Sequence, residues 1–237
     1  MVETRALCKR FGRLRVLDGI DMRVARNRVT AIVGPNAAGK TTLIKTILGL
    51  IRADDGKILV DGKAIEGDDA YRSRIGYMPQ IARFPENLSA TDLFEMLEDL
   101  RGVATRVDER LIDAFGLSSE VSKPLRTLSG GTRQKVNAVM AFLFAPDLLI
   151  LDEPTAGLDP VASGILKARI AQDRDGGKTF ILTSHIMSEL EELADDVVFL
   201  HDGRVAFAGP VDEIKTLTRQ TNLERAIAAM MLRGAAA

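Results

Sequence analysis

A glycine-rich run that carries a lysine and two threonines lies near the amino-terminal end of the chain. Residues 34–42 read G-P-N-A-A-G-K-T-T, which matches the G-x-x-x-x-G-K-T pattern of a phosphate-binding P-loop. The apolar run 29–33 precedes it, and apolar residues follow at the spacing of one helix face: Leu43, Ile44, Ile47 and Leu48. A strand, a glycine loop and a helix in this order are the context that the motif requires, so the sequence predicts a site for a nucleoside triphosphate.

Each part of this loop has a chemical task. Glycines let successive backbone N–H groups point at phosphate oxygens, and the start of the helix adds a partial positive charge. Lys40 is expected to reach the β- and γ-phosphates and to assist catalysis, while the Thr41 hydroxyl is expected to bind Mg²⁺. The other predicted contacts to the nucleotide from this loop are Gly34, Asn36, Ala37, Ala38, Gly39 and Thr42. The alternative is a glycine turn with a chance lysine.

A second motif places two acids directly after a strand. Residues 148–151 are apolar, and Asp152, Glu153 and Pro154 follow. At the carboxyl end of a buried strand, Asp152 could hold Mg²⁺ through water, and Glu153 could reach the water that attacks the γ-phosphate. The alternative is a helix cap, because Asp-Glu-Pro is also a fair helix start.

A third motif resembles a second anion cradle. Ser129, Gly130 and Gly131 precede a helical pattern, so a hydroxyl and free N–H groups would stand together. One chain has no need of two cradles for one nucleotide, which predicts that this one serves the nucleotide on another copy. The alternative is an ordinary serine-capped helix.

Taken together, these motifs resemble the ATP-binding-cassette (ABC) ATPases over essentially the whole chain. The matching features follow the family's order: an adenine-stacking aromatic at Phe11, Walker A at 34–42, the Q-loop at 77–80, the signature at 128–132, Walker B at 148–152 with Glu153 behind it, the D-loop at 156–159 and the switch histidine at His185.

The resemblance implies roles for these residues. Glu153 would polarise the attacking water, and His185 would contact the γ-phosphate. Gln80 would join Mg²⁺ or its water. The remaining implied contacts to ATP are stacking by Phe11, closure by Ser129 and Gly131 over the nucleotide of an opposing copy, and the D-loop residue Asp159. The chain departs from the usual family pattern at Ala37, where glycine is common, and at Thr132, where glutamine is common.

The expected fold is α/β, with a P-loop NTPase (RecA-like) core, an antiparallel β subdomain and an inserted α-helical subdomain. We expect one ABC ATPase domain over 1–237, with core and β subdomain at about 1–80 and 146–237 and the helical subdomain at about 81–145. Strands expected in the antiparallel sheet are 3–7, 20–24, 57–60, 63–65 and 75–78. Later strands are expected at 148–151, 179–183, 196–200 and 204–207, and later helices at 162–172, 187–194 and 222–232, with 234–237 frayed.

Composition limits the partners and the compartment. The formal net charge is −1, so no nucleic-acid partner is expected. Cys8 is the only cysteine, which excludes an internal disulfide and fits a reducing cytosol. The longest apolar stretch, 138–151, is interrupted by Pro146 and Asp147 and is too short to cross a bilayer. Together with this, the resemblance to ABC transporter subunits implies a peripheral place on the cytoplasmic face of the inner membrane.

The resemblance also predicts the biological role. The chain would be the ATPase subunit of a transporter, forming a homodimer that sandwiches two ATP and drives a separate integral membrane permease subunit. Its last residues resemble exporter-type (ABC-2) ATPases, and residues 77–88 resemble the subunit linked to copper-site assembly of nitrous-oxide reductase. The permease is expected to dock near residues 81–100, unless Phe84 and Leu88 only cap the lobe's own core. The alternative function is a non-transport ABC ATPase that acts as a nucleotide-gated clamp on a protein or nucleic acid.

Overall fold

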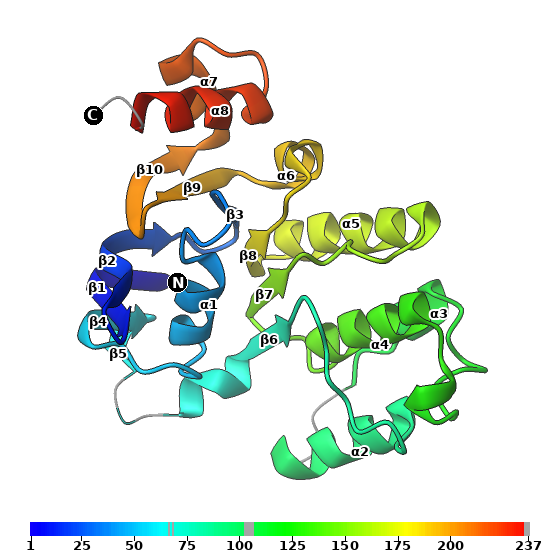
Figure 1. Ribbon diagram of the computed structural model, residues 1–237. Coiled ribbons are helices and arrows are strands. Elements are labelled where there is room, and N and C mark those ends of the chain that lie inside the picture. The colour runs from blue at the N-terminus through cyan, green and yellow to red at the C-terminus, as the bar shows by residue number, and fades with distance from the viewer. Residues whose placement is uncertain (66, 68, 102–106, 235–237) are drawn as a thin grey trace.

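Two β-sheets and a group of helices beside them make up the computed structural model (Figure 1). The structure describes residues 1–65, 67, 69–101 and 107–234. One sheet has four strands in the order β2-β1-β4-β5, and the other has six in the order β10-β9-β3-β8-β7-β6. In the described part of the chain, no helix combines the length and the apolar character needed to cross a membrane.

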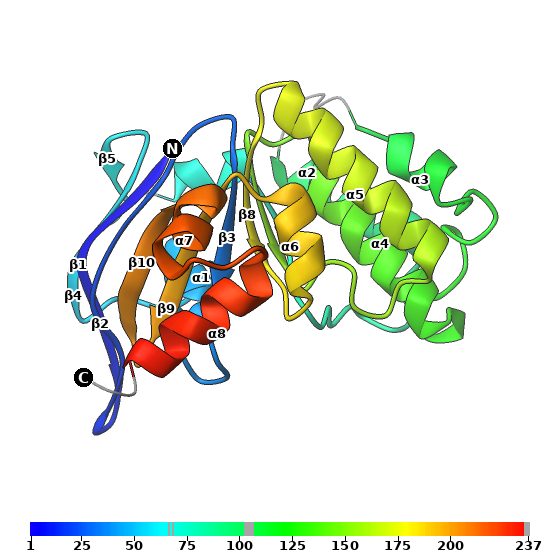
Figure 2. The ribbon, with the colours of Figure 1, turned by 90° about the horizontal axis from the view of Figure 1, so that it is seen from above.

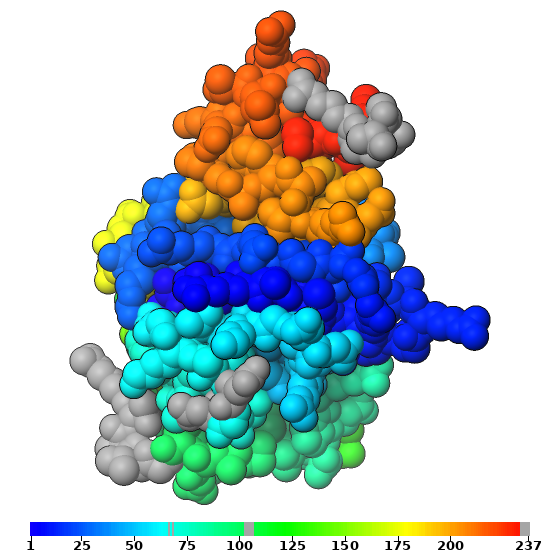
Figure 3. All heavy atoms as spheres, turned by 90° about the vertical axis from the view of Figure 1, so that its left-hand side faces the viewer, coloured from blue at the N-terminus to red at the C-terminus, as the bar shows by residue number. Residues whose placement is uncertain are grey.

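The smaller sheet is antiparallel, as expected. It contains β1 (Val2–Phe11), β2 (Leu14–Val24), β4 (Asp55–Val60) and β5 (Lys63–Ala64). Asp61 and Gly62 turn the β4–β5 hairpin with positive φ angles of 51° and 78°, which is the geometry that an Asp-Gly hairpin favours. Figure 3 shows β1 and β2 (blue) crossing one face of the molecule, with β9, β10 and the carboxyl-terminal helices (orange, red) above them.

The larger sheet is mostly parallel and forms the centre of the molecule. Its strands are β3 (Val29–Val33), β6 (Ile75–Met78), β7 (Leu148–Asp152), β8 (Thr179–Thr183), β9 (Asp196–His201) and β10 (Arg204–Pro210). Every residue of β3, β7 and β8 is buried, because a parallel sheet is covered on both faces.

The placement of 75–78 in the antiparallel sheet was wrong. This strand, β6, pairs in parallel with β7 through the register Ile75 to Leu148. The sequence of a four-residue strand does not indicate which strand it pairs with, and β7 lies about 70 residues later in the chain. The position is also specified by packing, because a Cβ on Gly76 would lie 2.0 Å from the Ala141 carbonyl oxygen. Only glycine lets the helix that contains Ala141 approach β6 so closely.

Helices cover both faces of the parallel sheet. They are α1 (Lys40–Ile47), α5 (Pro160–Asp175), α6 (Met187–Leu193), α7 (Val211–Thr218) and α8 (Leu223–Gly234), with a 3₁₀ turn η1 (Ala70–Arg74) before β6. The sequence analysis missed α7, which packs against α8 over β9 and β10 (Figure 2). Gly234, expected to fray, ends α8, and residues 235–237 lie outside the described part.

The helical lobe, which we define as the described residues of 81–145, joins β6 to β7. It contains α2 (Ala90–Arg101), α3 (Arg110–Ala114), a 3₁₀ turn η2 (Leu125–Thr127) and α4 (Gly130–Phe142). Ser89 and Asp92 bond each other reciprocally and cap α2. Phe84 and Leu88 are half-buried and pack against the larger hydrophobic core, which includes residues of both the lobe and the parallel sheet.

Candidate functional site

The P-loop joins β3 to α1, and two of its glycines have no room for a side chain. Gly34 has φ 155°, and a Cβ there would lie 2.2 Å from the Leu200 carbonyl oxygen. At Gly39, with φ 102°, a Cβ would lie 2.8 Å from the Val16 carbonyl oxygen. At these two glycines the backbone of the P-loop therefore packs directly against the backbones of β9 and β2.

Ala37 occupies the left-handed region with φ 65°. That conformation costs a residue with a side chain about 1–2 kcal/mol, which explains why glycine is the more usual choice here. Asn36 and Ala37 are exposed, Ala38 is buried, and Thr41 and Thr42 begin α1 with Thr41 exposed. The open side of the loop thus carries Asn36, Ala37 and Thr41.

Lys40 lies across the loop that it follows. Its Nζ donates to the Gly34 carbonyl at 2.7 Å and to the Pro35 carbonyl at 3.0 Å. Burial lowers the pKa of Lys40, and the charges of Glu153 and Asp152 partly oppose that shift. The ammonium group is therefore within electrostatic reach of both acids predicted to serve the nucleotide.

Asp152 and Glu153 stand at the carboxyl end of β7, and one threonine of β8 holds both. The buried Thr183 hydroxyl donates to Asp152 Oδ1. The Glu153 N–H lies 3.1 Å from the Thr183 carbonyl oxygen and 3.2 Å from its hydroxyl oxygen. Glu153 has φ 53°, a conformation that costs of order 1–3 kcal/mol and collects at functional sites. The helix-cap alternative was wrong, because α5 starts later, with Asp159 as its N-cap.

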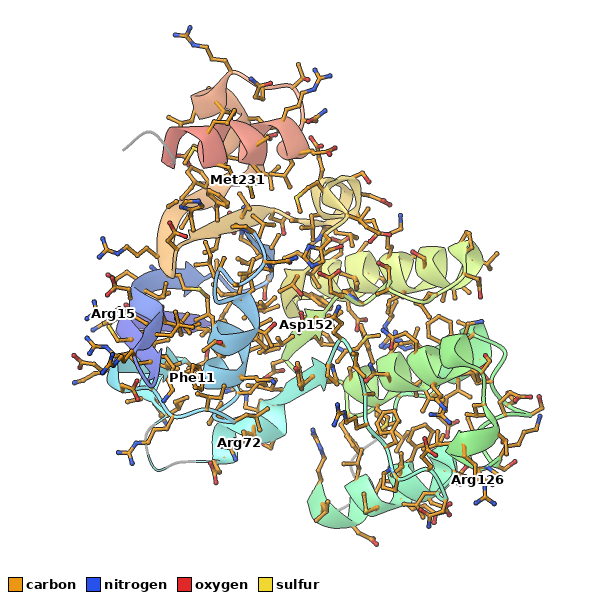
Figure 4. All side chains as sticks on the ribbon, in the orientation of Figure 1. Phe11, Arg15, Arg72, Arg126, Asp152 and Met231 are labelled. Atoms are coloured by element: carbon orange, nitrogen blue, oxygen red, sulfur yellow. The ribbon has the colours of Figure 1, made fainter. Side chains whose placement is uncertain are left out.

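His185 meets Glu153 across the ends of β7 and β8. The His185 N–H donates to Glu153 Oε2 at 3.1 Å, and its Nε2 lies 3.3 Å from Glu153 Oε1. The imidazole is 57% exposed, so it remains accessible from solvent while its backbone holds the carboxylate. The structure thus brings Lys40, Asp152, Glu153 and His185 together at the carboxyl ends of β3, β7 and β8, where ligands bind in open α/β sheets. Figure 4 shows Asp152 near the centre of the molecule, between α1 and α5.

The signature motif opens α4 and is already capped within the chain. Ser129 is the N-cap, its hydroxyl accepts from the Thr132 N–H at 3.1 Å, and the two hydroxyl oxygens are 2.8 Å apart. The serine-cap alternative therefore describes the local structure correctly. Among the described residues, no hydrogen bond or ion pair joins Ser129 or Gly131 to the P-loop of the same chain.

The D-loop lies beside the signature. A Cβ on Gly131 would lie 3.4 Å from the Gly157 carbonyl oxygen, and Lys135 of α4 pairs with Asp159 at 3.1 Å. Asp159 also accepts from the Ala162 N–H at 2.8 Å. This backbone bond and the Lys135 pair keep the pKa of the exposed Asp159 carboxyl below its ordinary value.

Gln80 and Phe11 lie on two other elements. Gln80 is exposed two residues beyond β6, and the buried Asn137 of α4 fixes the turn before it by donating to the Pro79 carbonyl at 2.8 Å. Phe11 is 49% exposed at the end of β1, with Lys9 Nζ 5.4 Å from its ring centre. Figure 4 labels Phe11 on the antiparallel sheet, and a half-exposed aromatic ring is a group that can stack on a base.

Sequence reasoning missed three residues of this region. Thr183 was quoted only as part of the switch motif, although a threonine at the end of a buried strand could have signalled it. The pairing of Lys135 with the D-loop has no sequence signal. Tyr77 of β6 was also missed: burial, and secondly the charge of Asp152, raise its pKa to about 12.

A family model described as "ABC transporter" matches residues 17–156. The chain belongs to this family. Family membership confirms the resemblance, the P-loop fold class, and the identity of the chain as an ATP-binding ATPase. The donor set also fits the Mg²⁺ that such ATPases use, since Thr41 and Asp152 offer hard oxygen ligands.

Two relatives in this family are named for drug resistance and for lantibiotic transport. The chain is 38% identical over 216 residues to the daunorubicin resistance ATP-binding protein DrrA3 of Streptomyces coeruleorubidus, covering 89% of this chain and 68% of that one. It is 31% identical over 222 residues to the lantibiotic transport ATP-binding protein SrtF of Streptococcus pyogenes, covering 94% and 96%. The link to nitrous-oxide reductase stays a prediction.

Solved structures agree with the fold. A structure described as the ATP-binding subunit of an ABC transporter superposes with a TM-score of 0.91 at 30% identity, covering 98% of this chain and 99% of the other. A dimeric ATP-binding cassette in a post-hydrolysis state, bound to ADP and Pi, superposes with a TM-score of 0.79 at 20% identity and covers 89% of this chain and 98% of the other. The second likeness concerns the fold alone.

Proposed function

We propose that two copies of this chain sandwich two ATP molecules and use their hydrolysis to drive a separate integral membrane permease subunit. The observation that carries the proposal is the gathering of Lys40, Asp152, Glu153 and His185 at the strand ends, while Ser129 and Gly131 make no polar contact with that group among the described residues. A site that needs both sets is completed by a second copy. The solved dimeric cassette with the same fold lends support.

The proposed chemistry follows from the positions of the acids. Glu153 accepts a hydrogen bond from the His185 backbone N–H and has a left-handed conformation just past the end of β7. There it would take up the proton of the attacking water, while His185 contacts the γ-phosphate. Lys40 would exchange its two loop carbonyls for phosphate oxygens when ATP binds. Phe11 would stack on the adenine.

Thr41, Asp152 and Gln80 are the proposed magnesium ligands. Thr183 bonds one oxygen of Asp152 and so orients the other for a water or a metal ion. The ion would neutralise charge on the β- and γ-phosphates. Gln80 lies on the loop between β6 and the helical lobe. Its contact with Mg²⁺ or its water would therefore link nucleotide binding to the position of that lobe.

The helical lobe is the proposed docking site of the permease. Ile81, Met96 and Leu100 are large apolar side chains that remain exposed on it, whereas Phe84 and Leu88 are used by the core. We therefore assign docking to the exposed set and propose the division into core (1–80 and 146–237) and helical subdomain (81–145). The complex would sit on the cytoplasmic face of the inner membrane and export its substrate, a role that is consistent with relatives named for drug resistance and lantibiotic transport. An Ile81→Asp variant should lose co-purification with the permease and keep its own ATPase activity.

The experiment that tests the proposed function is Glu153→Gln. The variant should bind ATP like the parent, lose turnover by about 100-fold or more, and accumulate as an ATP-bound dimer in size-exclusion chromatography. Glu192→Gln is the matched control, because Glu192 is a nearby exposed acid that pairs with Lys167 and should leave the rate unchanged. Parent-like hydrolysis by Glu153→Gln would exclude Glu153 as the catalytic base.

A further inference from the structure

A buried cluster of charges joins the helical lobe to the core. Arg169 of α5 donates from Nη2 to Asp108, which lies just before α3, and its Nε lies 3.0 Å from Asp173 Oδ1, one turn along α5. The three side chains are only 5–7% exposed. Arg110 pairs with Asp108 at 2.6 Å, and Lys178 pairs with Asp173 at 2.9 Å, so the two carboxylates face two further cations.

The carboxyl-terminal end of α4 is packed at the same place. The Arg169 guanidinium lies 5.1 Å from the Phe142 ring, and Phe142 contacts Phe180 of β8 with ring centres 6.3 Å apart. The Asp108 N–H donates to the Leu143 carbonyl at 2.7 Å. The residue before Phe142, Ala141, approaches Gly76 of β6 so closely that a Cβ on Gly76 would lie 2.0 Å from the Ala141 carbonyl oxygen. This end of α4 is therefore fixed to the sheet.

Two further contacts of charged side chains between lobe and core are more exposed than this cluster. Lys135 at the start of α4 pairs with Asp159, and these side chains are 22% and 52% exposed. At the end of α2, Arg101 Nη1 donates to the Ser73 carbonyl of η1 at 2.8 Å. Separating a buried charge pair leaves uncompensated charges away from water and costs far more than separating an exposed pair. A motion of the helical lobe relative to the core therefore costs the least free energy if the buried cluster stays intact and the more exposed contacts separate.

We propose that the cluster of Asp108, Arg169 and Asp173 is the pivot about which the helical lobe turns, and that Arg169 is a positioning residue for the signature motif. The inference rests on the proposed function, in which the signature must reach the nucleotide of a second copy. Helix α4 has 13 residues and spans roughly 20 Å at about 1.5 Å per residue. A small turn at Phe142 is thus magnified at Ser129. Figures 1 and 2 both show α4 and α5 lying side by side.

The bonding of Arg169 suits a pivot. Its Nη1 and Nε are buried without a hydrogen-bond partner among the described residues. One hydrogen bond, from Nη2 to Asp108, holds the guanidinium, and its remaining contacts are charge attraction to Asp173 and the face of the Phe142 ring, neither of which requires one fixed orientation. Such a group can rotate by several degrees while it stays in place.

The first test measures two distances with spin labels in a Cys8→Ser, Glu153→Gln background. Labels at the exposed residues Asp113 and Gln172 report the pivot end of the lobe, and labels at Arg126 and Gln172 report the signature end. Upon addition of ATP, the Arg126–Gln172 distance should change by several ångströms, and the Asp113–Gln172 distance should stay within its free-state distribution. Equal changes in both pairs, or no change in either, would overturn the pivot. Loss of ATP binding in the labelled proteins would contradict the proposed function instead.

The second test separates positioning from general loss of structure. Arg169→Met should lower kcat by about tenfold and leave the ATP affinity within about twofold, because the motion and not the nucleotide cradle is changed. Arg169→Lys keeps a charge between the two acids and should recover part of the loss. Arg74→Met is the control, since Arg74 forms exposed pairs with Asp61 and Asp147. A fall in affinity as large as the fall in kcat would assign Arg169 a merely structural role.

Discussion

The two glycine loops of this chain open their helices in opposite ways. At the P-loop, Gly39 precedes α1 and provides no side-chain cap, so the first N–H groups of the helix are left for an anion. At the signature, Ser129 caps α4 through the Thr132 N–H. The first loop leaves these N–H groups open, whereas the second is capped within the chain. Under the proposed function, Ser129 would exchange its bond to Thr132 when a nucleotide binds.

The glycines of the P-loop are closely packed, whereas Gly130 of the signature has free space around it. A Cβ at Gly34 or Gly39 would collide with backbone oxygens of β9 and β2, but a Cβ at Gly130 meets nothing within 4 Å. The P-loop is therefore part of the packing of the core, and the signature is a surface. The difference suggests that damage to the first loop shows in one copy alone, and that damage to the second shows only when two copies meet.

The largest expected effect is the contrast between Gly34→Ala and Gly130→Ala. Gly34→Ala should destabilise the fold by about 2–4 kcal/mol through the clash with Leu200 and abolish ATP binding. Gly130→Ala should keep the parent's melting temperature and its ATP affinity in dilute protein, yet lose ATPase activity. Calorimetric melting and equilibrium ATP binding measure both. A Gly130→Ala variant that fails to bind ATP as a monomer would remove the contrast.

Ser129→Arg should have the next largest effect. The long cation would block the surface offered to the second copy, so ATPase activity should fall by about tenfold or more. ATP binding by dilute protein should stay at the parental level, since Ser129 makes no polar contact to the P-loop among the described residues. Ser119→Arg, at an exposed serine of the same lobe, is the control. Parental ATPase activity of the Ser129→Arg variant at all protein concentrations would show that the signature has no part in hydrolysis.

The two loops should also differ in pH dependence. Burial lowers the pKa of Lys40 from the ordinary lysine value of 10.5, and the charges of Glu153 and Asp152 only partly oppose this shift. Loss of that charge weakens phosphate binding, and ATP affinity should therefore fall as pH rises through the alkaline range. The Ser129→Arg variant should give the same profile, because the signature contributes no titrating group. A flat ATP affinity from about pH 7 to about pH 10 would contradict this role of Lys40.

The smallest effect is expected at Ala37. Ala37→Gly relieves a left-handed alanine and should stabilise the protein by about 0.5–1 kcal/mol after the entropy of glycine is counted. Ala38→Gly, at the buried neighbour, should destabilise it. Paired denaturant titrations give the difference, and a destabilised Ala37→Gly variant would show that the left-handed alanine is not strained.

Local patterns predicted much of this architecture. The strand, glycine loop and helix at 29–48 and the two acids after 148–151 are encoded by neighbours in sequence, and the structure has them as expected. Features that depend on distant partners were not predictable in this way. β6 pairs with β7, which follows the helical lobe in the sequence. Thr183 bonds both acids from a different strand, β8. The positive φ angle of Glu153 is not indicated by its residue type.

Complementation between two inactive variants tests the shared site most directly. Lys40→Ala loses the P-loop and keeps the signature, whereas Ser129→Arg keeps the P-loop and loses the signature. Each alone should be inactive, and a mixture should regain about a quarter of the parental ATPase rate, because about half of random dimers are mixed and each of these has one complete site out of two. A mixture that stays as inactive as its components would contradict a site built from two copies.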